Sequence, residues 1–245
     1  MWTTADNGTV RRCLAIALAC LPLFTGVAGC STAEGRQAEA LLQGANQALA
    51  AVRSEQFVMR FEVEAEGHKL TMAMQGGAYL KGGQARDFYF TMTADGAPEL
   101  NSLNVTMVRR GGTASVRANG RTFSVPTPTA EQQFGSPTQF LDLERYVKSV
   151  SVDETDLGDR PADRIVGKLD TQALIGSVSG LATKALGAAG VHFGDIRAVL
   201  FIPRDTHLME VMFADLDVQA GGETAHMHIS IARSGINKPL SFPLL

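Results

Sequence analysis

The stretch Phe57-Val-Met-Arg-Phe-Glu-Val-Glu-Ala65 alternates between apolar and polar side chains. Successive side chains of an extended strand point to opposite faces, so a period of two separates the two kinds of residue. One face carries Phe57, Met59, Phe61, Val63 and Ala65, and the other carries Val58, Arg60, Glu62 and Glu64. A strand with one buried and one solvated face is typical of an antiparallel sheet. The stretch therefore predicts a half-buried strand of such a sheet.

Similar alternation continues along the chain. It predicts further strands near 70–75, 88–93, 103–107, 114–116, 123–125, 150–152 and 165–169, and three closing strands at 198–202, 208–213 and 226–232. We expect Gly76-Gly77 and Gly82-Gly83 to break the chain, and Gly111-Gly112 and Asn119-Gly120 to form hairpin turns. Helical periodicity predicts helices at 36–53, after Ser136-Pro137, and at 171–188. The order of elements indicates an α+β fold with one domain.

The N-terminus has the pattern of an export signal. Arg11 and Arg12 precede an apolar run over residues 13–24, which is shorter than the roughly 20 residues of a spanning helix. Val27-Ala28-Gly29-Cys30 follows, with small residues next to a cysteine whose thiolate is a nucleophile. Val27-Ala28-Gly29-Cys30 resembles the lipobox of bacterial lipoprotein signal peptides, and the resemblance implies cleavage before Cys30 and lipidation of its thiol. The alternative is an ordinary secreted protein with a cysteine near the cut by chance.

Composition limits the classes of protein that the chain can belong to. It has 245 residues, a net charge of −3 and 45% hydrophobic residues, which excludes a disordered or a multi-spanning chain. A mildly acidic chain without a long basic run argues against nucleic acid as a partner. Cys13 and Cys20 would leave with the signal, so the mature chain would retain Cys30 alone and form no internal disulfide.

Methionine and phenylalanine recur on the apolar faces of the predicted strands. Because methionine is flexible and polarizable, such a face could adapt to acyl chains in a cavity. The candidate cavity residues are Met59, Phe61, Met72, Met74, Phe88, Phe90, Met92, Val105, Met107, Leu174, Val178, Leu181, Met209, Phe213, Met227 and Ile229. The alternative is plain core packing against the helices.

Few residues suggest metal or catalytic chemistry. His226-Met-His228 puts two imidazoles on one face of a strand, a spacing that suits Zn²⁺ or Cu²⁺, with Asp215 or Asp217 as a neighbour. Met227 and Ile229 would occupy the inward face, so the histidines should point outward. The chain has no Gly-x-Ser-x-Gly, His-Glu-x-x-His or glycine-rich phosphate loop. We therefore expect no catalytic residue, no bound metal and no cofactor.

The cysteine motif, the helix after it, the long run of strands and two short phrases resemble a known group. The phrases are Asp163-Arg-Ile-Val-Gly167 and Ile202-Pro-Arg-Asp-Thr-His-Leu208. Together these features are similar to the LolA/LolB-like lipoproteins, and among them to the actinobacterial LppX/LprG-type lipoproteins. The chain departs from the best-known members because its only tryptophan, Trp2, lies in the signal and none lies in the predicted sheet.

The resemblance implies a strongly curved, incompletely closed antiparallel β-sheet, a half-barrel with helices packed on its concave side. It also implies a cleaved signal at 1–29, a lipidated tether at 30–35 and a single domain at 36–245. The protein would be a monomer on the extracytoplasmic face of the cell membrane, held there by acyl chains such as palmitate on Cys30. It would bind and transfer a lipid or glycolipid, with a membrane transporter as a candidate partner.

Two alternatives to lipid transfer remain open. The first is a structural or regulatory envelope lipoprotein with a filled core, which binds a protein or a cell-wall polymer through its surface. The second is a hydrolase of envelope lipid or glycan, which would need Ser, His and Asp side chains grouped at the mouth of a cavity.

Overall fold

The computed structural model describes residues 33–96, 104–111, 113–118, 120–126, 147–169, 191–220 and 222–245. Cys30, the predicted helix after Ser136-Pro137 up to residue 146, and the predicted helix at 171–188 lie outside the described residues. The described chain begins with helix α2 (Ala33–Ala51), which covers most of the predicted helix at 36–53.

Twelve strands follow the helix along the described chain. They are β1 (Ser54–Ala65), β2 (His68–Lys81), β3 (Gln84–Asp95), β4 (Asn104–Arg110), β5 (Thr113–Ala118), β6 (Arg121–Pro126), β7 (Val147–Leu157), β8 (Arg160–Leu169), β9 (Val191–Phe193), β10 (Ile196–Pro203), β11 (Val211–Ala220) and β12 (Glu223–Ser234).

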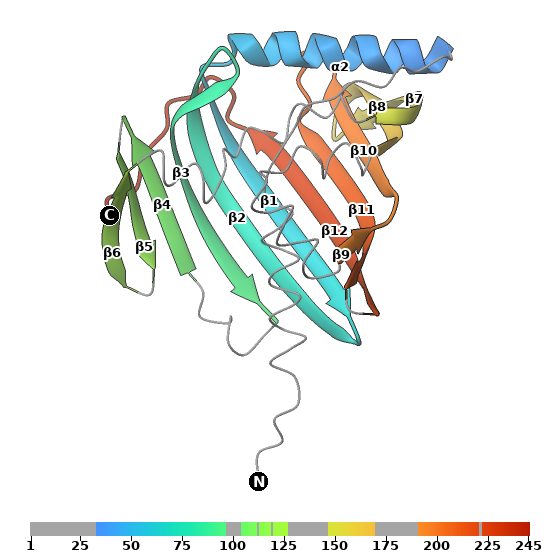
Figure 1. The fold of residues 1–245 in the computed structure, drawn as a ribbon. Coiled ribbons are helices and arrows are strands. Elements are labelled where there is room, and N and C mark those ends of the chain that lie inside the picture. The colour runs from blue at the N-terminus through green and yellow to red at the C-terminus, as the bar shows by residue number, and fades with distance from the viewer. Residues whose placement is uncertain are drawn as a thin grey trace.

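All the strands belong to one antiparallel sheet, whose two edge strands do not pair with each other. Its order is β6-β5-β4-β3-β2-β1-β12-β11-β10-β8-β7, and the short strand β9 pairs with β11. Strands β6 and β7 form the two edges, so the sheet curves without closing into a barrel (Figure 1). In the middle of the sheet β1 pairs with β2 on one side and with β12 on the other. The expected open, curved antiparallel sheet is confirmed.

The sheet has an apolar face and a polar face, as the stretch at residues 57–65 predicted. Phe57, Met59, Phe61 and Val63 of β1 expose between 1% and 5% of their surface, whereas Val58 between them exposes 52%. We call the side of the sheet that carries these buried residues the inner face, and the opposite side the outer face.

Helix α2 lies across one end of the strands (Figure 1). Its buried stripe, Ala38, Leu42, Ala45 and Leu49, recurs at the helical period and joins the same apolar core as the inner face. At its C-terminal end, Leu49 lies beside Gly83 in the turn between β2 and β3. No helix in the described part of the chain is long and apolar enough to cross a membrane.

The prediction that Gly76-Gly77 breaks the chain was wrong, because β2 continues through both residues to Lys81. Gly76 faces inward, where a Cβ would lie 2.1 Å from the carbonyl oxygen of Tyr89 and 2.9 Å from Cζ of Phe57. The glycine therefore lets the Phe57 ring and β3 approach the strand closely. Gly82 and Gly83 do form the turn, with φ angles of +61° and +78°.

The predicted strand at 208–213 was also misplaced. The chain turns after Pro203, where the N–H of His207 donates to the carbonyl of Pro203, and β11 begins only at Val211. Leu208 and Met209 are buried in this connection rather than in a strand. The short strand β9 had not been predicted.

The C-terminal residues 235–245 pack on the outer face. Phe242 stacks on Tyr79 of β2 with 5.6 Å between the ring centroids, and it meets Tyr89 of β3 edge-on at 5.2 Å. The Arg110 guanidinium lies 4.7 Å from the centroid of the Phe242 ring. The backbone N–H of Leu240 donates to the Tyr79 hydroxyl. This segment covers part of the outer face of β2 and β3.

Candidate functional site

A row of methionines crosses the inner face at right angles to the strands. Met92 of β3 is in register with Met74 of β2, and Met74 with Met59 of β1. Met59 is next to Ile231 of β12, which in turn is opposite Met212 of β11. We call Met92, Met74, Met59, Ile231 and Met212 the methionine row. Directly opposed side chains on one face of a sheet are in contact range, so the row forms a continuous flexible surface.

Aromatic and aliphatic side chains extend this surface on both sides of the row. Phe61 is in register with Met72 and with Ile229, and Phe90 is in register with Met107. The Phe88 and Phe90 rings stack with 6.2 Å between their centroids. The inner face of β1 to β4 and β12 is therefore apolar over most of its area.

Most of the predicted cavity residues lie on this face. The buried ones there are Met59, Phe61, Met72, Met74, Phe88, Phe90, Met107 and Met227. Met92, Val105 and Ile229 are half-buried and pack against the same core. Cys30, Leu174, Val178 and Leu181 lie outside the described residues.

The placement of Phe213 on the inner face was wrong. Because β11 starts at Val211, it directs Met212, Ala214, Leu216 and Val218 inward. Phe213 therefore points outward, where its ring stacks on His228 at 6.0 Å and meets Phe201 edge-on. Met209 is buried, but it belongs to the connection before β11.

A buried ion pair lies on the inner face at the α2 end of β1 and β12. Glu55 and Arg233 expose 2% and 7% of their surface. Nη1 of Arg233 lies 3.4 Å from Oε2 of Glu55. Burial raises the pKa of Glu55 despite the nearby guanidinium, and burial lowers the pKa of Arg233 to about 10. The low dielectric therefore opposes both charges, which have only each other as a counter-ion among the described residues.

Sequence reasoning missed this pair. Glu55 continues the inward positions of β1, one step before Phe57, and Arg233 continues those of β12 after Ile231. Extending the period of two to the strand ends would have placed both side chains on the inner face. Nothing in the sequence, however, indicated that β1 pairs with β12.

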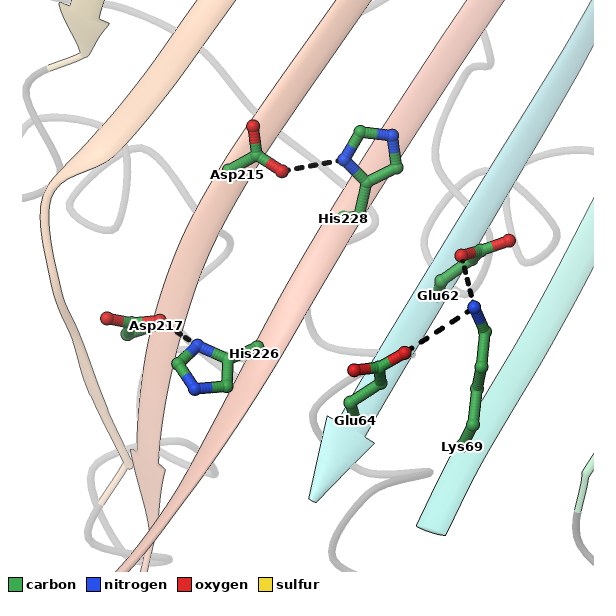
Figure 2. A network of polar contacts seen from close by, with 7 residues as sticks. All are labelled: Glu62, Glu64, Lys69, Asp215, Asp217, His226 and His228. Carbon is green, nitrogen blue, oxygen red and sulfur yellow. Dashed lines mark hydrogen bonds and ion pairs between the residues drawn. The ribbon is translucent and has the colours of Figure 1, made fainter. Parts of the chain in front are cut away.

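The outer face carries a network of charged residues (Figure 2). Nδ1 of His226 lies 2.5 Å from Asp217, and Nδ1 of His228 lies 2.6 Å from Asp215. On the next strands Lys69 donates to Glu62 and pairs with Glu64. The hydrogen bond from Lys69 lowers the pKa of Glu62. The outward direction of the histidines and their aspartate neighbours agree with the prediction, but within the described ranges no three such side chains group as metal ligands.

A groove runs between α2 and the connection from β10 to β11. It has a volume of about 490 Å³ and is lined by Leu41, Gly44, Ala48, Ile202 and His207, together with Ala40 and Gln47. Ile202 belongs to the inner face of β10 and is 1% exposed. The groove therefore lies beside the α2 end of the inner face.

No protein-family model and no curated protein sequence matches the chain. Among solved structures, LprF from Mycobacterium bovis superposes with a TM-score of 0.54 at 13% identity, covering 87% of this chain and 99% of LprF. The lipoprotein LppX of Mycobacterium tuberculosis gives a TM-score of 0.49 at 12% identity, over 84% of this chain and 98% of that one. A LolA superfamily protein from Nitrosomonas europaea gives 0.31 at 10% identity, over 84% and 94%. The superposition on LprF, at 13% identity, shows that the chain shares the fold of that protein.

Proposed function

We propose that the protein is a membrane-anchored envelope lipoprotein that binds and transfers a lipid or glycolipid between the inner face of the sheet and its helices. The observation that carries this proposal is the methionine row, which crosses β3, β2, β1, β12 and β11 without a polar residue. Acyl chains vary in length and unsaturation, and methionine side chains can repack around different shapes.

The hydrophobic effect would supply the binding energy. Each Å² of apolar ligand surface removed from water is worth about 25 cal/mol before the costs of ordering. Binding needs neither a cofactor nor a metal, and a membrane transporter or a lipid gradient would give transfer its direction. The groove beside α2 is the place where a ligand would reach the inner face from solvent.

The position of α2 supports anchoring close to the membrane. The helix begins at Ala33, three residues after Cys30. Three extended residues span about 10 Å, so acyl chains on Cys30 would hold the α2 end of the domain near the extracytoplasmic surface. Mass spectrometry of the N-terminal peptide from membranes tests this anchor. Acyl chains on Cys30 support it, and an unmodified thiol or an uncleaved signal contradicts it.

The lipid proposal is tested by native mass spectrometry of the full chain extracted from membranes. We expect the wild-type protein to retain lipid. Met92→Trp should reduce the bound lipid several-fold, because a larger side chain on the methionine row takes up the space of an acyl chain. Thr93→Trp is the matched control, because Thr93 is the next residue of β3 and is exposed on the outer face. Equal lipid loss in both variants would argue that tryptophan acts through the fold and not through the site.

One observation favours the second candidate, a structural or regulatory lipoprotein with a filled core. Met59, Met72 and Met107 expose only 1% to 2% of their surface, because other protein atoms cover the rest. Lipid entry would therefore require this face to open. If wild-type protein holds no lipid and takes up none that is added, the filled-core candidate replaces lipid transfer, and the partner would bind the outer surface.

A further inference from the structure

The Glu55–Arg233 pair is poorly satisfied for a buried ion pair. Oε2 of Glu55 accepts no hydrogen bond in the described part of the chain. Nη1 of Arg233 lies 3.4 Å from this oxygen, and the guanidinium makes no other polar contact within the described residues. The backbone N–H of Arg233 is already bonded, at 2.7 Å, to the carbonyl of Glu210. A buried donor and a buried acceptor therefore lie side by side with capacity left for another group.

Neighbouring charges at the same end of the sheet are satisfied much better. Asp163 accepts from Arg204 at 2.7 Å and 3.2 Å. Glu210 accepts from Arg160 at 2.5 Å and from the hydroxyl of Thr206 at 2.9 Å. Because leaving buried charges without hydrogen bonds is costly, the Glu55–Arg233 pair differs from its surroundings in a way that points to a ligand.

The pair also lies next to the apolar surface. Glu55, Phe57 and Met59 are successive inward residues of β1, and Arg233 is in register with Phe57. Two residues of a strand span about 6.8 Å, so Glu55 is about 14 Å from the methionine row. That is the distance between the polar end of an acyl lipid and the middle of its chain. A lipid chain that runs along β1 and crosses the methionine row near its middle would thus bring its polar end to Glu55 and Arg233.

The charges of the pair select the chemistry of that polar end. An anionic group would be attracted by Arg233 but would meet the carboxylate of Glu55, and a cationic group would meet Arg233. A hydroxyl group donates one hydrogen bond and accepts another, so it can donate to Oε2 of Glu55 while accepting from the guanidinium. A neutral hydroxyl is therefore the group that satisfies both side chains at once.

We propose that Glu55 and Arg233 form a subsite for a hydroxyl group at the polar end of an acylglycerol-type lipid, whose chain runs along β1 and crosses the methionine row. This inference rests on the proposed lipid-binding function and adds the chemical class of the head group. A buried ion pair would then be kept for recognition, since well-packed apolar residues often stabilise such a position equally well.

A competition experiment tests the subsite. The full chain, extracted from membranes and stripped of lipid, is mixed with equal amounts of a monoacylglycerol, the fatty acid methyl ester and the free fatty acid, all with the same acyl chain. Native mass spectrometry counts the bound species. We expect the monoacylglycerol to exceed each of the other two by about tenfold, which corresponds to about 1.4 kcal/mol.

Two double variants separate recognition from folding. In Glu55→Met/Arg233→Met the preference for monoacylglycerol over methyl ester should fall about tenfold, to near unity. The matched control is Asp153→Met/Arg164→Met, which removes an exposed outer-face pair with a separation of 2.8 Å. The control should keep the wild-type preference. Circular dichroism shows whether each variant is folded.

Each remaining outcome overturns the inference. A wild-type protein that binds all three ligands equally binds acyl chains without a hydroxyl subsite. A preference for the free fatty acid assigns the site to an anion instead. A wild-type protein that binds none of them refutes the proposed function itself, which separates that failure from the failure of the subsite. The wild-type competition decides these points even if the variant does not fold.

Discussion

Gly76 shows how strongly a single residue constrains the curved sheet. A Cβ at this position would lie 2.1 Å from the carbonyl oxygen of Tyr89 and 2.9 Å from Cα of Phe90, and both are backbone atoms. Gly76→Ala must therefore shift β3 away from β2. Overpacking typically costs 1–3 kcal/mol, and we expect this variant to lose about 2–3 kcal/mol of unfolding free energy, measured by urea titration.

Gly44 provides the matched control in α2. No atom lies within 4 Å of a Cβ built there, and the residue is helical. Gly44→Ala should raise the unfolding free energy by about 0.5–1 kcal/mol, because alanine favours the helix. A Gly76→Ala protein as stable as the wild type would show that the contact between β2 and β3 is not tight.

The same residue explains one failure of the sequence analysis. A Gly-Gly pair indicates a break when only local preferences are considered, and Gly82-Gly83 behaves that way. Gly76 is instead required by the backbone of Tyr89 and Phe90 and by the Phe57 ring, which come from the neighbouring strands. Which of the two roles a glycine plays depends on the tertiary neighbours, and these are not visible in its own stretch of sequence.

At the scale of elements, the C-terminal segment 235–245 is held by the side chain of Phe242 and by hydrogen bonds to Arg53, Ser54 and Tyr79. The Phe242 ring contacts Tyr79, Tyr89 and Arg110 on three different strands. An aromatic pair is worth about 0.5–1.5 kcal/mol beyond burial, and an exposed cation–π contact about 0.5–1 kcal/mol. Phe242→Ala should therefore lower the unfolding free energy by about 1–3 kcal/mol. Hydrogen exchange should report faster opening of residues near 235–245.

Leu244 is the control for the segment, because 90% of its surface is exposed. Leu244→Ala should change the unfolding free energy by less than about 0.5 kcal/mol. If Phe242→Ala has an equally small effect, the segment is held by its backbone contacts, such as the hydrogen bond from Ser54 Oγ to the carbonyl of Lys238.

Strands with one polar face were predicted well, whereas the start of β11, which has two apolar faces, was not. In β1, Arg60, Glu62 and Glu64 fix which side chains face water. The start of β11 reads Val211-Met-Phe-Ala214, with apolar residues at both parities. A shift of one residue then exchanges the two faces, which is why Phe213 was assigned inward in place of Met212. The outward position of Asp215 and Asp217 decides the register.

At the scale of the whole molecule, the pairing of β1 with β12 joins the two halves of the open sheet. The methionine row and the Glu55–Arg233 pair both cross this seam. Their individual residues were predictable from strand periodicity, but their assembly was not, because strand order is a long-range property. The inner-face residues on β1 to β4 were therefore identified from sequence, whereas the ion pair became visible only once the two strands were paired.

The ion pair at the seam should also make the stability of the molecule depend on pH. Burial raises the pKa of Glu55 above its ordinary value of 4.5, while Arg233, with a pKa of about 10, remains protonated throughout the acid range. As pH rises from 4.5, the unfolded chain releases the Glu55 proton before the folded protein does. The folded state then binds more protons, so this group lowers the unfolding free energy as pH increases.

The effect is isolated by comparing the wild type with Glu55→Met/Arg233→Met in urea unfolding at pH 4, 5, 6 and 7. Both proteins keep the Glu62–Lys69 pair. The lowered pKa of Glu62 gives the opposite trend, because its contribution to the unfolding free energy is present above the ordinary pKa and is lost as pH falls. That contribution cancels in the difference. We expect the double variant to gain on the wild type as pH rises from 4 to 7. If the wild type gains instead, Glu55 is stabilised as a carboxylate in the fold, and Arg233 satisfies it better than a separation of 3.4 Å indicates.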